Sequence, residues 1–243
     1  MTAQIRTLEH VKNSLDPEAL KIFQNQWSTY RKLLEFNYLS HHEVLSALGS
    51  AIAEIKGPIS FLDLACGDAY GIREALSGVS MERYVGVDMS ISALRLAAQE
   101  FHDATFRVDL VQGDMFEGLN EQKDPFDFVW CGLCLHHLRT EDKLEALKAM
   151  RRITRKSCMI YEPTLVGDET QAEFMTRFLR DNIQAWNKLT PQQWADISAH
   201  VTQCDLPESE ENWRNLGLMS GFREARSIFH SPTNFAVLYR YDV

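Results

Sequence analysis

The fold is decided by the stretch Phe61-Leu-Asp-Leu-Ala-Cys-Gly-Asp-Ala-Tyr-Gly71 of this 243-residue chain. It begins as a short apolar run, Ile59–Leu64, and passes into a turn that contains glycine, which is the pattern of a buried strand that ends at a tight loop. Gly67 lets the backbone turn sharply and lets a ligand approach it closely. The stretch therefore predicts a strand, a turn and a helix, with a ligand at the turn.

Similar apolar runs follow along the chain and alternate with segments of helical spacing. We predict further strands at Tyr84–Val87, Phe106–Val111, Phe126–Cys131 and Cys158–Tyr161, helices at Ile72–Leu76, Ile91–Phe101 and Glu141–Ile153, and a terminal antiparallel hairpin of Glu224–Phe229 and Phe235–Tyr241 around a turn at 231–234. Alternation of this kind implies a parallel sheet with helices on both faces.

Helical segments precede and interrupt this core. The first fifty-odd residues are predicted to be helical, with a helix start at Asp16-Pro17, apolar residues at helical spacing from Leu20 to Leu34, and a second helix from about Ser40 to Ile55. A helical stretch also fills residues 164–220, far more than a crossover needs. We expect one domain with an N-terminal helical lid (1–56), a cofactor-binding core (57–163), a helical cap insertion (164–220) and a terminal hairpin (221–243).

The bulk composition narrows the class of partner. The formal net charge of −9 argues against a nucleic-acid partner and against an anionic membrane surface, since both are held by basic patches. We see no signal peptide and no apolar run of bilayer length. Five cysteines is an odd number, so we expect reduced thiols in a cytoplasmic protein. We expect a monomer or a homodimer.

Three predicted strands end in acids, and in an open parallel sheet ligands bind at the carboxyl ends of the strands. Asp63 flanks the glycine turn. Asp88 follows about twenty residues later, where a carboxylate can accept both hydroxyl groups of a ribose. Asp114 ends the third strand, where it can accept from an adenine amino group, and Met115 offers the base an apolar contact. Together these residues predict a nucleoside site.

Dinucleotide enzymes also combine a glycine-rich turn with a ribose-binding acid. Their fingerprint needs Gly-x-Gly-x-x-Gly, whereas here Ala65 replaces the first glycine and the spacing differs. Charge separates the two interpretations further, because Asp63 and Asp68 flank a turn where a pyrophosphate needs positive potential. Acids there suit an ammonium group. S-adenosylmethionine has a ribose, an adenine and an ammonium group but no phosphate, and we predict it as the cofactor.

These motifs resemble the class I S-adenosylmethionine-dependent methyltransferases of the small-molecule branch. Leu62–Ala69 is similar to the first motif of the family, Val85–Asp88 to the second, Val111–Asp114 to the third, and Phe126–Leu138 to its fourth strand and turn. The likeness covers roughly residues 59–163 and extends to the terminal hairpin. It implies an α/β, Rossmann-like, doubly wound sheet of seven strands with the last antiparallel, and S-adenosylhomocysteine as the product.

The resemblance also implies which residues hold the cofactor. They are Ala65, Gly67, Asp88, Met89, Asp114, Met115 and the segment from Cys131 to Leu133, to which we add Asp63 for the ammonium group and Tyr30 from the N-terminal helix expected to fold over the cofactor. The chain departs from the family at Ala65 and Ala69, where glycine is usual. Alanine is tolerable there if φ is negative.

The segment after the fourth predicted strand raises two further questions. Cys131 and Cys134 have the spacing of a redox or zinc pair, and His136 and His137 are close by. A redox pair is expected after the first strand rather than the fourth, and successive strand residues point to opposite faces. We therefore expect no metal. His136 and His137 face the region of the transferred methyl group, where either can act as a general base.

Our first hypothesis for function is methyl transfer to a small organic molecule by in-line displacement. A second is an enzyme that modifies the cofactor, similar to carboxymethyl-cofactor synthases. Such enzymes need an arginine that faces the methyl carbon, and Arg214 is the candidate in this chain. A third is a non-catalytic cofactor-binding partner, for which the alanines of the turn are the support.

Overall fold

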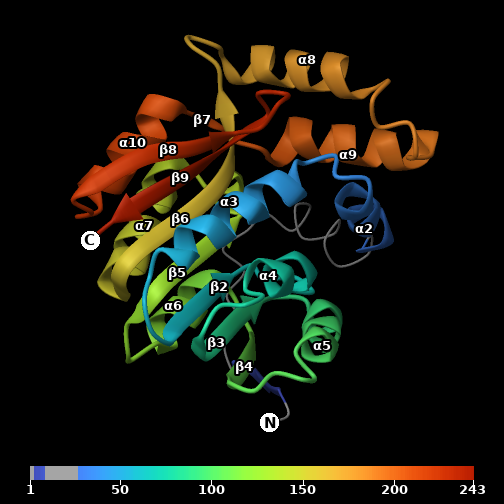
Figure 1. Cartoon of the computed structure of the whole chain (residues 1–243). Coiled ribbons are helices and arrows are strands. Elements are labelled where there is room, and N and C mark those ends of the chain that lie inside the picture. The colour runs from blue at the N-terminus through green and yellow to red at the C-terminus, as the bar shows by residue number, and fades with distance from the viewer. Residues whose placement is uncertain (1–2, 9–26) are drawn as a thin grey trace.

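The computed structural model describes residues 3–8 and 27–243. The helix start predicted at Asp16-Pro17 and the first apolar positions of that helix lie outside the described residues. The described chain forms a central sheet with helices on both faces. A further pair of helices lies beyond the carboxyl ends of the parallel strands (Figure 1).

The sheet contains nine strands in the described residues, in the order β1-β4-β3-β2-β5-β6-β9-β8, with β7 paired to β6. The strands are β1 (Gln4–Thr7), β2 (Ile59–Leu64), β3 (Met81–Asp88), β4 (Arg107–Gln112), β5 (Phe126–Gly132), β6 (Thr154–Leu165), β7 (Glu208–Ser209), β8 (Glu224–His230) and β9 (Ala236–Asp242). β1 to β6 pair in parallel, and β9 pairs antiparallel with both β6 and β8. The Rossmann-like fold, the antiparallel last strand and the terminal hairpin are thus as predicted.

The predicted count of seven strands was too low. Gln4–Thr7 forms an edge strand beside β4, so the expectation that the first fifty-odd residues are helical was wrong at this point. Three of its four residues are exposed, and the segment has no apolar run. The other additional strand, β7, has only two residues. Neither segment has the periodic apolar pattern by which strands are recognised in a sequence.

The helices divide between the two faces of the sheet. They are α2 (Trp27–Glu35), α3 (His41–Ala53), α4 (Tyr70–Ala75), α5 (Ile91–Glu100), α6 (Met115–Glu121), the 3₁₀ turn η1 (Leu135–His137), α7 (Thr140–Arg152), α8 (Gln171–Asn182), α9 (Pro191–Cys204) and α10 (Glu210–Met219). One apolar core joins α3, α4, α5, α8 and α9 to the sheet, and a second joins α6, α7 and α10 to its other face. α6 was missing from our predictions, because its seven residues directly follow a strand end.

Within residues 164–220, the helices have two different positions. α8 and α9 lie beyond the carboxyl ends of the parallel strands (Figure 1). Both begin with a capping box, Thr170 with Glu173 and Thr190 with Gln193, which satisfies backbone N–H groups of the first turn. α10 instead covers the sheet, with Trp213 fully buried in the second core. Across the described ranges, no helix combines the length and apolarity needed to cross a bilayer.

Candidate active site

A cavity opens at the carboxyl ends of β2, β3, β4 and β5, where the fold class places ligands. Its lining comes from the loops that follow these strands and from α2: Tyr30, Ala65, Gly67, Val87, Asp88, Met89, Ser90, Gly113, Asp114, Met115, Gly132, Leu133, Cys134 and His137. Nine of the twelve predicted site residues are therefore brought together in one cavity, which we call the first cavity. None of these fourteen residues is a lysine or an arginine.

The Asp88 carboxylate is held in a fixed orientation at the end of β3. Oδ2 accepts a hydrogen bond from the Gly67 N–H at 2.9 Å, and Oδ1 accepts one from the Ser90 N–H at 2.7 Å. The helix cap of α5 is Ser90, whose side chain accepts from the Ala93 N–H, so Asp88 is not needed for capping. An ionised carboxylate has about four acceptor positions. Two therefore remain for hydroxyl groups of a ligand.

Asp114 has a structural role as well as a place in the first cavity. Its side chain caps α6 by accepting from the Phe116 N–H at 2.8 Å, and the residue is 2% exposed. The cap directs the carboxylate and Met115 toward the same wall of the first cavity. An adenine ring needs a polar group at its edge and an apolar side chain against its face, which the Asp114 carboxylate and Met115 can provide.

The turn after β2 uses the left-handed region of the backbone. Ala65, Gly67 and Ala69 have φ values of 56°, 55° and 54°, and Leu133, across the first cavity, has a φ of 52°. Our condition that φ be negative at the two alanines is not met. An L-residue in this conformation costs roughly 1–2 kcal/mol, and strained residues gather where a ligand must be approached closely.

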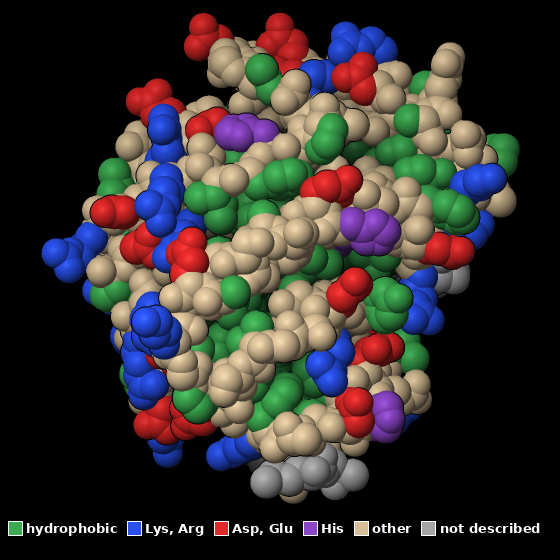
Figure 2. All heavy atoms as spheres, in the orientation of Figure 1, with side chains coloured by type: hydrophobic (Ala, Val, Ile, Leu, Met, Phe, Trp, Pro, Cys, Tyr) green, Lys and Arg blue, Asp and Glu red, His purple; other side chains and the backbone are tan. Residues whose placement is uncertain are grey.

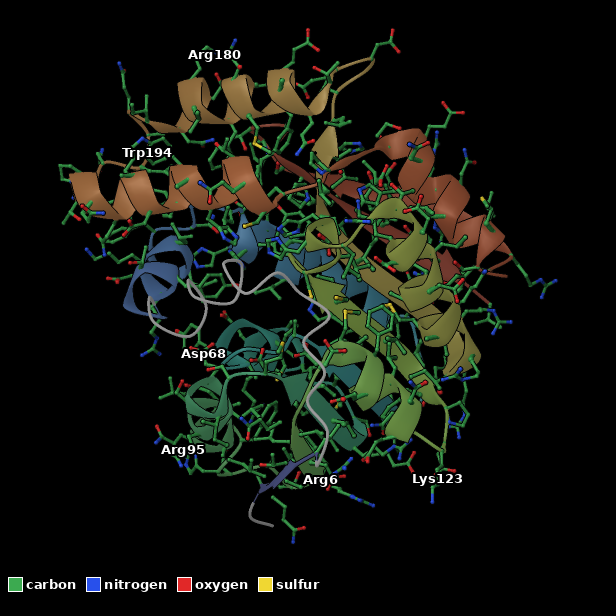
Figure 3. All side chains as sticks on the ribbon, turned by 180° about the vertical axis from the view of Figure 1, so that it is seen from behind. Arg6, Asp68, Arg95, Lys123, Arg180 and Trp194 are labelled. Carbon is green, nitrogen blue, oxygen red and sulfur yellow. The ribbon has the colours of Figure 1, made fainter. Side chains whose placement is uncertain are left out.

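Acidic side chains surround the turn. Asp68 is 4% exposed and lies between α2 and the helices α4 and α5 (Figure 3), where its carboxylate is 3.6 Å from the Arg31 guanidinium. Burial raises the pKa of Asp68, although the Tyr70 N–H and Arg31 oppose the shift. Burial also raises the pKa of Tyr30, and the charges of Asp68 and Asp88 add to the effect. This side of the cavity therefore favours a cationic ligand.

Asp63 and Cys131 were predicted to contact the cofactor, but they lie outside the lining of the first cavity. Asp63 is 1% exposed and accepts a hydrogen bond from the Tyr84 hydroxyl at 2.6 Å. Burial raises its pKa to about 8, against the opposing effect of Tyr84. Cys131 is fully buried in the second core. Asp63 therefore lies behind the turn and does not line the first cavity.

A second cavity adjoins the first and shares three of its lining residues, Tyr30, Leu133 and His137. Most of its wall is apolar and comes from α2, α8, α9, the loops that follow α2 and α8, and the turn before β9: Leu33, Leu39, Phe178, Trp186, Ile197, Val201 and Phe235. Polar groups gather at one end, where His136, His137, His200 and Asp205 line the wall. The aromatic residues of the insertion thus divide, since Phe178 and Trp186 line the second cavity while Trp213 is core.

The predicted catalytic residues, His136 and His137, meet in this region. Their rings lie with centroids 4.0 Å apart because both belong to η1 rather than to a strand. His137 lines both cavities, whereas His136 lines only the second. Burial lowers the pKa of both imidazoles well below the usual value, so both are neutral at neutral pH.

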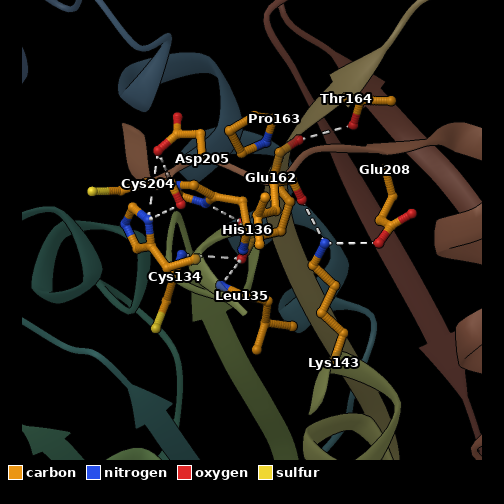
Figure 4. Close-up of polar contacts among 12 residues, drawn as sticks. Cys134, Leu135, His136, Lys143, Glu162, Pro163, Thr164, Cys204, Asp205 and Glu208 are labelled. Atoms are coloured by element: carbon orange, nitrogen blue, oxygen red, sulfur yellow. Dashed lines mark hydrogen bonds and ion pairs between the residues drawn. The ribbon is translucent and has the colours of Figure 1, made fainter. Parts of the chain in front are cut away.

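A buried glutamate at the end of β6 organises η1. Glu162 accepts hydrogen bonds from the backbone N–H groups of Cys134 at 3.1 Å and Leu135 at 2.9 Å, and lies 2.6 Å from His136 Nδ1 (Figure 4). Burial raises the pKa of Glu162 to about 7. Sequence reasoning missed Glu162, His200 and Asp205, because they lie far along the chain from η1 and no local motif marks them.

Basic side chains on the strands β8 and β9 are paired with acidic ones. On the face shown in Figure 2, basic side chains over β8 and β9 lie next to acidic ones. Arg226 pairs with Asp242 at 3.1 Å, and Arg240 pairs with Glu54 at 2.8 Å. These arginines are therefore engaged in ion pairs within the chain.

Comparison with known proteins finds a family whose model is similar to the core of the chain. Residues 61–157 match the family described as "Methyltransferase domain". The demethylmenaquinone methyltransferase of Staphylococcus carnosus (strain TM300) is 29% identical over 152 residues, which are 61% of this chain. The chain spans 61% of the length of that relative.

Solved structures share the fold at low sequence identity. The magnesium protoporphyrin IX methyltransferase of Synechocystis PCC 6803, crystallised with bound SAH, is 14% identical and aligns with a TM-score of 0.62 over 92% of this chain and 97% of its own. The plantazolicin methyltransferase in complex with SAH is 12% identical, with a TM-score of 0.62 over 93% of both chains. The fold therefore extends beyond the matched residues to the cap helices and the hairpin.

Proposed function

We propose that this chain is a class I S-adenosylmethionine-dependent methyltransferase and transfers a methyl group from S-adenosylmethionine to a small organic acceptor, a proposal supported by its similarity to methyltransferases. The observation that carries the proposal is the pair of adjoining cavities that meet at Leu133 and His137. One has the polar groups that a nucleoside needs, and the other has an apolar wall. The methyl group crosses the boundary between them.

The first cavity supports the cofactor through its acids. In the proposed complex, Asp88 accepts the two ribose hydroxyl groups on the acceptor positions left by Gly67 and Ser90. The adenine lies beside Asp114 and Met115. The ammonium group and the sulfonium lie on the side of Asp68 and Tyr30, where acidic charge is concentrated. This orientation directs the methyl carbon toward the second cavity.

The reaction is an in-line displacement at that carbon, in which the sulfonium leaves as the neutral thioether of S-adenosylhomocysteine. Little covalent assistance is needed, and positioning of the two reactants can supply up to about 7–11 kcal/mol of the barrier. Leu133, fixed in a left-handed conformation by its N–H bond to the Tyr161 carbonyl at 2.7 Å, shapes the boundary that aligns them.

The second cavity supports an acceptor with an apolar, largely planar body and one polar group. Phe178, Trp186 and Phe235 offer aromatic surface to the body, and the polar end of the cavity receives the group that is methylated. His137 lies nearest the cofactor cavity. As a neutral imidazole it can accept the acceptor's proton, and His136 stands behind it as the second candidate.

The alternative of a carboxymethyl-type cofactor synthase needs an arginine that faces the methyl carbon, and Arg214 does not lie there. Arg214 is exposed on α10, which covers the sheet, and is not among the residues that line the two cavities. In the described part of the chain, neither lining includes a lysine or an arginine that could pair with a carboxylate on the methyl carbon. The linings of the two cavities therefore support methyl transfer better than cofactor carboxymethylation.

Two measurements on the purified chain test the proposal. Calorimetry with S-adenosylhomocysteine is expected to give one site per chain, and incubation with methyl-labelled cofactor and a panel of quinols, phenols and thiols of apolar body is expected to label at least one acceptor. Absence of binding at millimolar ligand would refute the cofactor assignment. Binding without turnover on any acceptor would favour a non-catalytic cofactor-binding partner.

A further inference from the structure

Two histidines and an aspartate converge at the polar end of the second cavity. One ligand atom from each of His136, His137 and Asp205 lies within 4.8 Å of the others. Asp205 Oδ1 is 3.6 Å from His136 Nε2 and 3.5 Å from His137 Nδ1. Donor atoms bound to one tetrahedral zinc ion at 2.0–2.1 Å are about 3.4 Å apart. The cluster therefore needs only a small contraction to bind one ion.

The same distances are too long for hydrogen bonds, which span about 2.7–3.2 Å for nitrogen and oxygen. Asp205 is 2% exposed, and its Oδ1 accepts no hydrogen bond from the described residues. Buried carboxylate oxygens are normally satisfied, and an exception calls for an ion or a water. Asp205 Oδ1 faces His136 Nε2 and His137 Nδ1, and His137 Nδ1 also lies 3.5 Å from the Cys204 carbonyl. An ion between the three side chains would use both rings and replace that long contact.

The surroundings of His136 match those of a metal ligand. Its Nδ1 is engaged by Glu162 at 2.6 Å, which leaves Nε2 directed at Asp205 (Figure 4). Metal-binding histidines usually donate their second ring nitrogen to a carboxylate in this way, which fixes the tautomer and the ring orientation. Glu162 is therefore a positioning residue.

Asp205 is also held in place from both sides. The Leu206 N–H donates to the His136 carbonyl at 2.7 Å, and Gln171 Nε2 donates to the Asp205 carbonyl at 2.6 Å. Lys143, buried in α7, contacts the Leu206 carbonyl and pairs with Glu208 at 2.8 Å (Figure 4). The chain after α9 is thus fixed against η1 before any ligand arrives.

The donor set points to a divalent transition metal ion. Glu162 and Asp205 are buried carboxyl groups beside two imidazoles, and Lys143 is engaged by Glu208. Imidazole with carboxylate suits zinc and neighbouring transition metals, whereas magnesium and calcium prefer oxygen ligands alone. Two histidines with one carboxylate leave further coordination positions open, as catalytic metal sites do. His136, His137 and Asp205 all line the second cavity.

We propose that His136, His137 and Asp205 bind one divalent first-row transition metal ion, zinc foremost, whose open position faces the acceptor. The proposal departs from our expectation of no metal, which assumed that the two histidines lie on a strand, whereas both belong to η1. His200 lies next to this cluster, with Nε2 3.9 Å from Asp205 Oδ1.

The role of the ion rests on the proposed function. With the ion bound, an acceptor hydroxyl or thiol would bind it and release its proton to solvent, and the oxygen or sulfur anion would attack the methyl carbon. His137 would then be a ligand of the ion rather than the base. The new bond to carbon forms as the carbon–sulfur bond of the cofactor breaks, and that electron pair stays on the cofactor's sulfur. The ion thereby lowers the pKa of the group that is methylated.

Metal binding itself is tested without turnover. The full chain is stripped with a chelator, reloaded with zinc or cobalt(II), and its bound metal is measured by elemental analysis and by the visible spectrum of the cobalt form. We expect one ion per chain for the wild type and for His102→Ala, a control at an exposed histidine of the surface. Asp205→Asn and His137→Ala are expected to bind well below one ion, and Glu162→Gln to bind roughly 10–100-fold more weakly.

Binding of S-adenosylhomocysteine separates the possible failures. A variant that retains this binding is folded, so its loss of metal is a loss of the site. Less than about a fifth of an ion in the wild type, or equal metal in wild type and in folded Asp205→Asn, would overturn the metal site and leave the methyltransferase proposal standing. Metal at full stoichiometry with no cofactor binding would support the metal site and refute the methyltransferase proposal.

Discussion

Replacement of Asp88 by asparagine is expected to weaken cofactor binding strongly. The carboxylate is oriented by N–H groups at 2.9 Å from Gly67 and 2.7 Å from Ser90, which leaves two acceptor positions for the ribose hydroxyls. Hydrogen bonds to a charged group contribute about 1.5–3 kcal/mol each, so loss of two costs about 3–6 kcal/mol. At 1.4 kcal/mol per factor of ten, the dissociation constant rises roughly 10²–10⁴-fold.

Calorimetry with S-adenosylhomocysteine measures this change directly. Asparagine can accept from only one of the two N–H groups, so the thermal melt of the variant is recorded first to show that it folds. Asp109→Asn is the matched control, because Asp109 lies on the neighbouring strand β4 and pairs with Arg107 away from both cavities. A folded Asp88→Asn chain whose dissociation constant stays within threefold of wild type would refute the assignment of Asp88 to the ribose.

Three further predictions concern stability. Ala69→Gly removes a left-handed alanine with a φ of 54°, and we expect it to stabilise the fold by up to about 1 kcal/mol in urea unfolding, whereas a clear loss of stability would contradict the strain. Burial raises the pKa of Asp63 to about 8, above its unfolded value, so its favourable contribution is complete below about pH 4 and is lost as the pH rises toward 8. The stability advantage of Asp63→Asn over wild type should therefore grow between pH 5 and pH 8, by at most about 1.4 kcal/mol per pH unit, and an advantage independent of pH would show that Asp63 titrates normally. Lys143→Met leaves Glu208 buried without its ion-pair partner and should cost about 3–5 kcal/mol, against less than about 1 kcal/mol for Lys148→Met at the exposed pair with Glu145, and equal costs would contradict the buried pair.

Most of the sheet could be predicted from the sequence because its central strands are buried on both faces. Every residue of Ile59–Leu64 is buried, which produces the continuous apolar run. The edge strand Gln4–Thr7 has three exposed residues and gives no such signal. An edge strand, which pairs with one neighbour alone, can lack the apolar run by which a strand is recognised in a sequence.

Most residues that line the first cavity could also be predicted, because the topology of a parallel sheet brings successive strand ends together. Asp88 and Asp114 needed only their position after a strand. Asp63 was placed in the cavity because the alternation of side chains along β2 was not resolved beside a turn, and the residue instead lies under Tyr84. The backbone of the turn was beyond sequence reasoning, since alanine gives no sign of a positive φ at Ala65 and Ala69.

The histidine cluster could not be predicted, because it is assembled over long separations in the chain. Asp205 lies 68 residues after His137, at the end of α9, and reaches η1 only through the packing of the cap helix. His136 and His137 converge because they lie in a 3₁₀ turn. This turn follows Cys134 and, before it, Leu133, whose backbone is left-handed. Tertiary placement of this kind leaves no periodic trace in the sequence.

The crystal structure of the chain with S-adenosylhomocysteine tests the central claim most directly. We predict that the ribose hydroxyls contact Asp88, that the adenine lies beside Asp114 and Met115, and that the sulfur faces the boundary formed by Leu133 and His137. Ligand density in any other cavity, or a sulfur atom directed away from the second cavity, would contradict the account.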